Sequence, residues 1–357
     1  RVPARWLPNE LALSGRMSGS LNTTIRSGQI NSVGNLDFQE GRVEGIPLNQ
    51  IQFTAGMTTS GGFERIVGSG RVAGGSIRFE GTQSRLSLSG DGLNLAQVTP
   101  VQRFIAASGI FSLQANLQRS GQDWIGPIQT TGQNGEIGYQ PFDTLEGSIQ
   151  LVSGGYAEIS EISLLQPGRS HRVKGWLALD GSSSQLQVTS RNIRAENILP
   201  WLPSGVFISG NVDNDLMITG SLYNPITAGQ VRLSDGSVGT AQDSTILLDR
   251  LNGSYQRNNG VWALSDIQVS NWNMNFSAQG TVEENGHYEI RIFDGQMPLE
   301  RALWRWPYPA TGQTYFSGNL SGQGTDFSFV GEANGPALKM NDQDIQDFRA
   351  RVEIRDR

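Results

Sequence analysis

The sequence contains no cysteine, which excludes disulfides, thiolate zinc sites and a cysteine nucleophile. This absence is compatible with an oxidising envelope compartment. Charged residues make up only 17% of the chain, and the net charge of −6 is spread along it without a long block of like charges. A polybasic arm is therefore missing, and we expect no nucleic-acid partner.

Long hydrophobic runs are missing as well. A membrane-spanning helix needs roughly eighteen consecutive apolar residues, and the sequence holds no such stretch. The chain begins at Arg1 without the charged, apolar and small-residue series of a signal peptide. We therefore expect an internal fragment of a longer protein, with any inner-membrane anchor lying outside it.

What is abundant is glycine, with 45 residues, together with alternating apolar and polar residues. This alternation places apolar side chains on one face of a β-sheet and polar side chains on the other. Asp-Gly, Asn-Gly and Asn-Pro pairs lie between the alternating runs and are typical of tight turns. The sequence thus predicts an all-β protein of antiparallel strands. The residues expected to line its apolar face are Leu86, Leu88, Leu177, Leu179, Leu186, Val188, Leu216, Ile218, Val231, Leu233, Ile246, Leu248, Ile267, Val269, Met274, Phe276, Ile290, Ile292, Phe327 and Phe329.

A second repeat, with a much longer period, accompanies this alternation. A Ser-Gly pair opens a strand at intervals of roughly 100 residues. A glycine turn with a further strand follows it each time, in segments that begin at Glu40, Asn134, Asp235 and Asn334. About eight short strands fit one period. Spacers rich in proline or serine are not seen between the periods, and this favours one continuous repeat array. The expected units are 9–107, 108–208, 209–315 and a partial unit at 316–357.

Helical-looking material is confined to a short segment before each Ser-Gly strand. Prolines interrupt this segment every time, so we expect one short, proline-broken helix per repeat. The segments either plug the sheet or stand at the mouth of an apolar channel. Their aromatic residues are Trp6, Phe104, Trp201, Trp304 and Trp306.

The sequence offers little for catalysis or metal binding, and we expect no cofactor and no metal. His171 and His287 lack paired-ligand spacing, and we interpret them as surface or strand-edge residues. An acidic segment at 341–347 resembles a calcium loop but lacks its central glycine and distal glutamate. Glu158 and Glu161 are a possible acid–base pair, although turns and polar strand faces favour solvated charges.

The segment Gly220–Val238 reads GSLYNPITAGQVRLSDGSV. Its succession of Gly-Ser-Leu-x-Asn-Pro, Gly-x-Val-x-Leu and Asp-Gly resembles the repeat unit of the TamB family and the related AsmA-like intermembrane proteins. The resemblance covers essentially the whole chain and is clearest from Gly175 to Val330. The segment from Ser18 departs from the pattern, because it keeps Gly-Ser-Leu-Asn and loses the proline.

This resemblance implies an elongated, open, taco-like β-groove with an apolar lumen, located in the periplasm of a diderm bacterium. The resemblance also implies that the protein conducts phospholipids between the inner and outer membranes and supports outer-membrane biogenesis. The implied partners are phospholipid acyl chains, an outer-membrane barrel-assembly protein of the TamA type, and the inner membrane. None of these roles requires a catalytic residue.

Two other classes of function stay open on the residues alone. A structural or adhesive surface array of closed β-sandwiches would show the same alternation, because strand periodicity does not distinguish a filled core from an open groove. A β-rich carbohydrate-active enzyme would use a pair of carboxylates such as Glu158 and Glu161.

Overall fold

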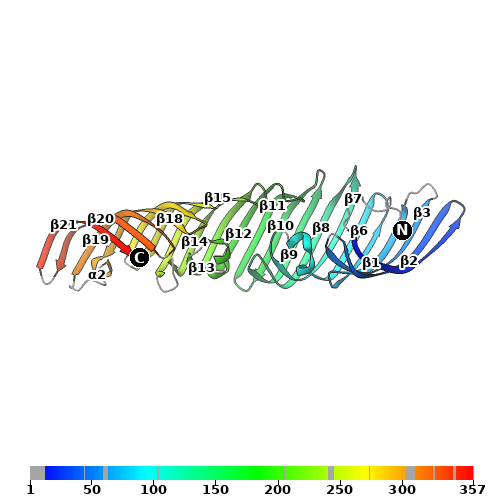
Figure 1. Cartoon of the computed structure of the whole chain (residues 1–357), viewed down its shortest axis with the longest axis horizontal. Helices are drawn as coiled ribbons and strands as arrows, with labels where there is room; N and C mark the ends of the chain where they lie inside the picture. Colours follow the sequence, from blue (N-terminus) through cyan, green and yellow to red (C-terminus); the bar gives the residue numbers. More distant parts are fainter. Residues whose placement is uncertain are drawn as a thin grey trace. The chain divides into compact units, whose positions relative to one another are not determined.

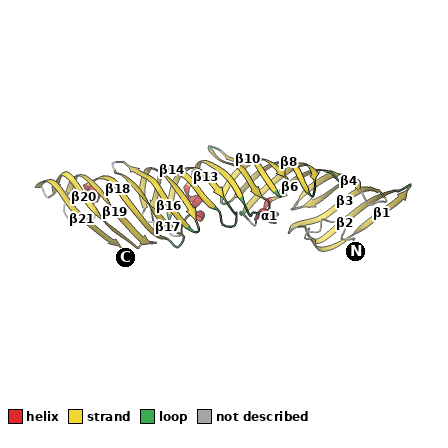
Figure 2. Cartoon of the chain, turned by 90° about the horizontal axis from the view of Figure 1, so that it is seen from above, coloured by secondary structure: helices red, strands yellow, loops and turns green. Residues whose placement is uncertain are grey.

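The computed structural model describes residues 13–43, 45–58, 63–102, 104–203, 206–239, 245–272, 274–302, 310–324, 326–340 and 343–356. These residues form 21 strands of one open antiparallel sheet and a few short helices (Figures 1 and 2). The predicted all-β, antiparallel class is therefore confirmed. Within the described part of the chain, no helix is long and apolar enough to cross a membrane.

The chain divides into two compact units. Unit 1 comprises Arg1–Leu186 with Ser221–Tyr223, and unit 2 comprises Gln187–Gly220 with Asn224–Arg357. Strands of unit 1 are β1 (Leu13–Arg26), β2 (Gln29–Val43), β3 (Ile46–Thr58), β4 (Phe63–Val72), β5 (Gly75–Gly81), β6 (Arg85–Asn94), β7 (Ala107–Ser120), β8 (Asp123–Ile137), β9 (Gln140–Val152), β10 (Tyr156–Gln166) and β11 (Arg169–Ala178). Strand β12 (Ser184–Arg194) begins in unit 1 and ends in unit 2.

The strands of unit 2 follow the same plan, in which each strand pairs with the next one along the chain. They are β13 (Phe207–Thr219), β14 (Ile226–Gly239), β15 (Thr245–Asn258), β16 (Val261–Asn271), β17 (Met274–Glu283), β18 (His287–Pro298), β19 (Ala310–Gln323), β20 (Asp326–Met340) and β21 (Gln343–Asp356). The described helices are η2 (Leu95–Gln97), α1 (Thr99–Gln102), η3 (Ala195–Trp201) and α2 (Leu299–Ala302).

Three of the four Ser-Gly landmarks, at Gly15, Gly109 and Gly210, lie at β-bulges where two strands approach closely. The fourth, Ser317-Gly318, pairs with β20 in regular register. Gly210 in β13 has a φ of 111°, and a Cβ atom added to it would lie 2.7 Å from the Cα of Gly236 in β14. The same close approach joins Gly15 to Gly41 and Gly109 to Gly135. Only glycine fits such a position, because a side chain would collide with the facing backbone.

The predicted glycine turns after these landmarks are wrong. Glu40, Asn134 and Asp235 have positive φ angles of 52°, 51° and 50°, yet they lie inside β2, β8 and β14 and not between strands. A bulge residue and a hairpin turn both need positive φ, so the Asp-Gly or Asn-Gly pair fits either. Six longer strands, β1–β6, therefore fill the first period in place of the eight short strands expected.

The largest described core lies in unit 2, where η3 packs on the sheet. Val212 and Leu233 are fully buried, at 0% exposure, in a cluster with Ala195. Ile198 from η3 packs against the same cluster, while Trp201 at its end is 50% exposed. The plug over this face is thus aliphatic, and Trp201 is not the residue that fills it.

The segment that contains the Asn-Pro motif begins with a turn, Ser221–Tyr223, that belongs to unit 1. The Leu222 N–H donates to the Gly181 carbonyl at 2.9 Å. The Tyr223 hydroxyl donates to the Asp180 carbonyl at 3.2 Å, and the Tyr223 ring lies 5.4 Å from that of Phe104. Leu222 therefore belongs to a turn and not to the apolar strand face.

Replacing a glycine by alanine should lower the stability only where the added Cβ atom would collide with the neighbouring backbone. We expect Gly135→Ala to lower the free energy of unfolding by about 2 kcal/mol, because its Cβ would lie 2.2 Å from the Ser108 carbonyl oxygen. Gly56→Ala is the matched control, since its nearest neighbour would be 3.5 Å away. Urea unfolding of both variants measures the difference, and equal midpoints would contradict the steric account.

Candidate functional site

The predicted lining residues of unit 2 lie on one face of the sheet. One cross-strand row runs through Leu216, Gly229, Tyr255, Leu264, Gly280, Ile290, Leu320, Phe329 and Ile354. Paired residues of an antiparallel sheet share a face, so the neighbouring rows extend the same surface. We call this surface the apolar face. The other predicted residues that register places on it are Ile218, Val231, Leu233, Ile267, Val269, Met274, Phe276, Ile292 and Phe327. Leu248 lies on it as well, because it is buried in one cluster with Leu233 and Val269.

Burial divides the apolar face into a covered part and an open part. Leu233, Leu248 and Val269 are buried in the cluster under η3. Most of the other predicted residues, including Ile290 and Phe329, are only half-buried. For Ile246, the structure describes the backbone but not the side chain. The open part is therefore an extended apolar surface that protein atoms cover incompletely.

Aromatic rings on this face occupy the space above cross-strand glycines. A Cβ added to Gly318 would lie 2.7 Å from the Phe329 ring, and one added to Gly295 would lie 2.6 Å from the Phe316 ring. Each ring thus fills the position that the glycine side chain leaves vacant. Many of the glycines consequently serve the sheet face, in addition to those that form turns.

Unit 1 carries the same kind of face. Leu88 pairs with Phe79 and Ala115, and Leu86 pairs with Leu117. Leu177 pairs with Ala157. Through the intervening strands, register places Leu86, Leu88 and Leu177 on one face.

Three further predictions concern residues at or after β11. Leu186 is buried and Val188 half-buried, both in β12. Leu179 was expected on the apolar face, but it lies beyond the end of β11 and is 53% exposed. The prediction for Leu179 is wrong, because the strand and its alternation stop at Ala178.

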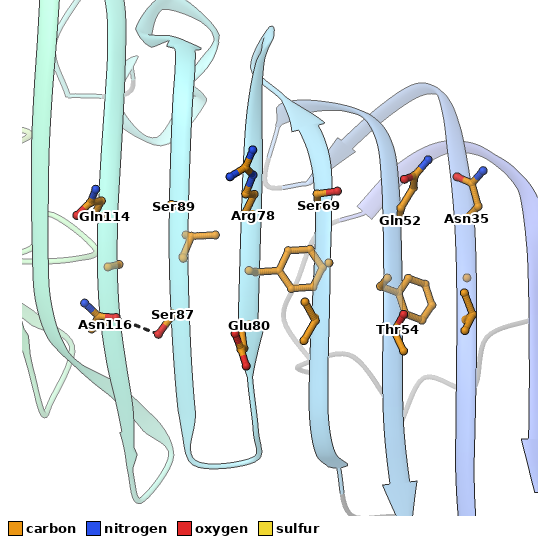
Figure 3. Close-up of a pocket in the computed structure, with 18 of the residues that line it drawn as sticks. Asn35, Gln52, Thr54, Ser69, Arg78, Glu80, Ser87, Ser89, Gln114 and Asn116 are labelled. Atoms are coloured by element: carbon orange, nitrogen blue, oxygen red, sulfur yellow. Dashed lines mark hydrogen bonds between the residues drawn. The ribbon is translucent and has the colours of Figure 1, made fainter.

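A hollow of about 890 Å³ lies over β1–β7 in unit 1, and it opens on the polar face (Figure 3). Two cross-strand rows form its walls, and both are polar except for Val33 and Val67 in one of them. The backbone of the row between them, which includes Gly34 and Gly68, is its floor. The wall residues labelled in Figure 3 are Asn35, Gln52, Thr54, Ser69, Arg78, Glu80, Ser87, Ser89, Gln114 and Asn116. These hydroxyl, amide and charged groups suit hydration, although the exposed side chains of Val33 and Val67 interrupt them.

Glu161, one member of the candidate acid–base pair, lacks the electrostatics of a general acid. Glu161 accepts a hydrogen bond from Ser163 at 2.9 Å, and its other oxygen lies 3.0 Å from the Lys174 ammonium. Hydrogen bonds from Lys174 and Ser163 lower the pKa of Glu161, whereas a general acid needs a raised pKa. The geometry gives Glu161 the role of an ion-pair partner.

The two histidines differ from each other. His171 was expected at the surface, but it is 8% exposed and stands opposite Leu164 in the sheet. Burial lowers its pKa to about 4. His287 is half-buried, and its Nε2 lies 3.8 Å from a Glu289 oxygen. The expectation of a surface position is therefore wrong for His171.

The calcium-like segment gives no metal site that the structure describes. Asp342 lies outside the described residues, while Asp344 and Asp347 are exposed on β21. Among the described residues, no cluster of three histidine, aspartate or glutamate side chains could hold a metal ion. Trp6, Trp304 and Trp306 also lie outside the described residues.

Sequence reasoning missed a group of polar and aromatic residues along one edge of the apolar face. We call this group the rim, and its members are Tyr255, Arg257, Trp262, Glu284 and Tyr288. Arg257, Trp262 and Tyr288 belong to one cross-strand row. The available signal was the alternation of Tyr255 and Arg257 with Ser254 and Gln256, which places both on the apolar face.

Four of the rim side chains, all except Tyr288, form a chain of contacts. The Tyr255 and Trp262 rings lie 5.5 Å apart, and the Arg257 guanidinium carbon lies 6.0 Å from the centre of the Trp262 ring. Arg257 Nη2 donates a hydrogen bond to Glu284 Oε1. The Tyr255 hydroxyl donates to Asn214 at 3.1 Å, and burial raises the pKa of Tyr255. The apolar face thus ends in amphipathic side chains with polar tips.

Comparison with known proteins identifies no relative. No protein-family model, curated protein or solved structure matches this chain. Functional inference must therefore start from the two chemically different faces of the sheet.

The buried imidazole of His171 predicts an acid-sensitive stability. Its pKa rises from about 4 in the folded state to its ordinary 6.5 on unfolding, so the unfolded state binds more protons between these values. The contribution is complete above about pH 6.5 and is lost as the pH falls toward 4, by about 2–3 kcal/mol. We expect His171→Gln to remove this part of the pH dependence.

Urea unfolding at about pH 7 and pH 4.5, for the native chain and the variant, measures this effect. Carboxylates that titrate in the same range contribute equally to both proteins, so the difference isolates His171. Parallel stability profiles for the two proteins would rule out a buried neutral histidine.

Proposed function

We propose that this chain is a lipid-conducting β-groove that moves phospholipids between the inner and outer membranes of a diderm bacterium. The observation that carries the proposal is the apolar face, which continues through β13–β21 in register and is only partly covered by protein. The resemblance of Gly220–Val238 to the TamB and AsmA-like repeat supports the same function. In this proposal the chain lies in the periplasm and belongs to a parent protein anchored in the inner membrane.

The energetics of acyl chains fit such a face. Each methylene group removed from water contributes about 0.8 kcal/mol. Successive rows present similar apolar surface, so an acyl chain passes from one strand pair to the next without re-entering water. The polar headgroup stays at the open edge of the groove. No chemical step is involved, and we propose that the chain is not an enzyme.

The finer architecture is part of the proposal. Bulges increase the local twist and bend of strands, and they recur at Gly15, Gly109 and Gly210. We propose that they curl the sheet into a taco-like groove, with one short helix per repeat resting on the lumen as η3 does. An outer-membrane barrel-assembly protein of the TamA type would receive the groove through the parent chain.

The alternative is a structural or adhesive array of closed β-sandwiches. A sandwich needs a second sheet packed on the apolar face of the first. The described strands all belong to one sheet, and Ile290 and Phe329 remain half-buried. These observations favour the groove.

Site-specific photo-crosslinking tests the proposal. We expect a photoreactive side chain at Ile290 or Phe329 to capture phospholipid several-fold more than one at Glu289 or Ser328. The last two are their immediate neighbours on the opposite face. Leu233 is unsuitable for this test because it is fully buried. The measurement is lipid-specific mass spectrometry of the crosslinked chain.

Two results would overturn the groove. Equal capture on both faces would indicate non-specific lipid contact. Protein–protein crosslinks at Ile290 and Phe329 without lipid would indicate that another protein surface covers the face, as in a sandwich array.

A further inference from the structure

The rim carries a pair of opposite charges beside the apolar face. Arg257 stands opposite Trp262, one residue before the end of β15, and Glu284 lies in the turn between β17 and β18. The Glu284 N–H donates to the Gly260 carbonyl at 2.9 Å, and its carboxylate lies over Gly260. Both charges are therefore held at hairpin ends, where the apolar rows finish.

The ion pair is accessible to a ligand. The Arg257 side chain is 26% exposed and the Glu284 side chain 58% exposed. Exposed ion pairs contribute little net stability, because each charge is well solvated when they part. Arginine also carries five N–H donors, and the bond to Glu284 is made through Nη2. A ligand with complementary charges can insert between the partners at little cost.

Amphipathic aromatic residues surround the pair. Tyr255, Trp262 and Tyr288 present apolar rings to the face, and the Tyr288 hydroxyl donates to the Asp326 carbonyl at 3.4 Å. Side chains of this kind are favoured where an apolar phase meets water. The rim is therefore the place where the acyl part of a lipid ends and its headgroup begins.

We propose that Arg257 and Glu284 bind the headgroup of a zwitterionic phospholipid that carries a phosphate and a primary ammonium group. Arg257 binds the phosphate through paired N–H donors, and Glu284 accepts hydrogen bonds from the ammonium. The acyl chains lie on the neighbouring row, which contains Tyr255 and Ile290. This assignment rests on the proposed lipid-conducting function and specifies its substrate class.

Hydrogen-bonding chemistry separates this headgroup from the other common ones. A choline headgroup has no N–H to donate to Glu284, and a glycerol headgroup leaves Glu284 facing an uncompensated phosphate. Loss of one charge-assisted hydrogen bond corresponds to about a tenfold weaker interaction. We therefore expect bound phosphatidylethanolamine to exceed phosphatidylcholine and phosphatidylglycerol by about tenfold.

The experiment incubates the full chain with vesicles containing equal amounts of these three lipids and analyses the bound lipid by mass spectrometry. Glu284→Gln should abolish the phosphatidylethanolamine enrichment while total bound lipid stays within about twofold. Arg257→Gln should lower the capture of all three phospholipids relative to diacylglycerol, which lacks the phosphate.

The matched control is Asp215→Asn, which removes the partner of Arg191 in unit 2. This ion pair has a separation of 2.8 Å and lies on the polar face. Enrichment should be unchanged in this variant. Thermal unfolding of each variant verifies that the sheet is intact, and Glu284→Asp, which keeps the carboxylate, should restore part of the enrichment.

If the native chain binds the three lipids in the proportions present in the vesicles, the headgroup site is overturned, while the proposed lipid-conducting groove is unaffected. Enrichment that persists in Glu284→Gln, or a preference for phosphatidylglycerol, would overturn it as well. Failure of every protein to bind lipid at any composition would instead overturn the proposed function itself.

Discussion

The structure depends on keeping many strands in phase while the sheet bends. A residue inserted into one strand shifts all following side chains to the other face unless the sequence compensates. In β16 the inserted residue is Asp266, with a φ of 51°, and register keeps Leu264 and Ile267 on the same face although they are three positions apart. The alternation of apolar residues thus shifts by one position where the bulge inserts a residue, and the apolar face stays continuous across the bulge.

Glycine makes this arrangement possible in two ways. At Gly210 and Gly236 it permits two backbones to approach more closely than any side chain allows. On the apolar face, Gly318 and Gly295 leave space that the rings of Phe329 and Phe316 fill. Large and empty positions alternate across strands, so a face rich in glycine still presents apolar surface. The high glycine content therefore reflects sheet construction as much as turn formation.

Alternation alone predicted the sheet class and nearly all of the apolar face, because side-chain direction in a strand follows a period of two. It failed where backbone geometry is ambiguous from sequence. Asp235 supplies a positive φ to a bulge within β14, and the same residue type supplies it to a hairpin turn, so an Asp-Gly pair alone does not distinguish the two. Leu179 failed because the end of β11 follows from tertiary pairing and not from local pattern.

The candidate site was predictable only in its apolar part. His171 has a polar side chain, and its burial beside Leu164 follows from cross-strand register that the local sequence does not state. The rim combines Arg257 from β15 with Glu284 from the β17–β18 turn, and β16 and β17 lie between them along the chain. To predict such a contact, one must know the order and register of the neighbouring strands, and a repeat pattern does not specify them.

A conduit must bind its cargo without trapping it, and the two faces of the sheet meet this requirement differently. Uniform apolar rows provide no deep minimum for an acyl chain, because neighbouring positions offer similar contact. The rim balances the charge of Arg257 with that of Glu284, so a zwitterionic headgroup exchanges one pair of ionic contacts for another. An unpaired arginine would hold any phosphate far more firmly. The exposed ion pair therefore allows headgroup selection at an affinity that still permits release.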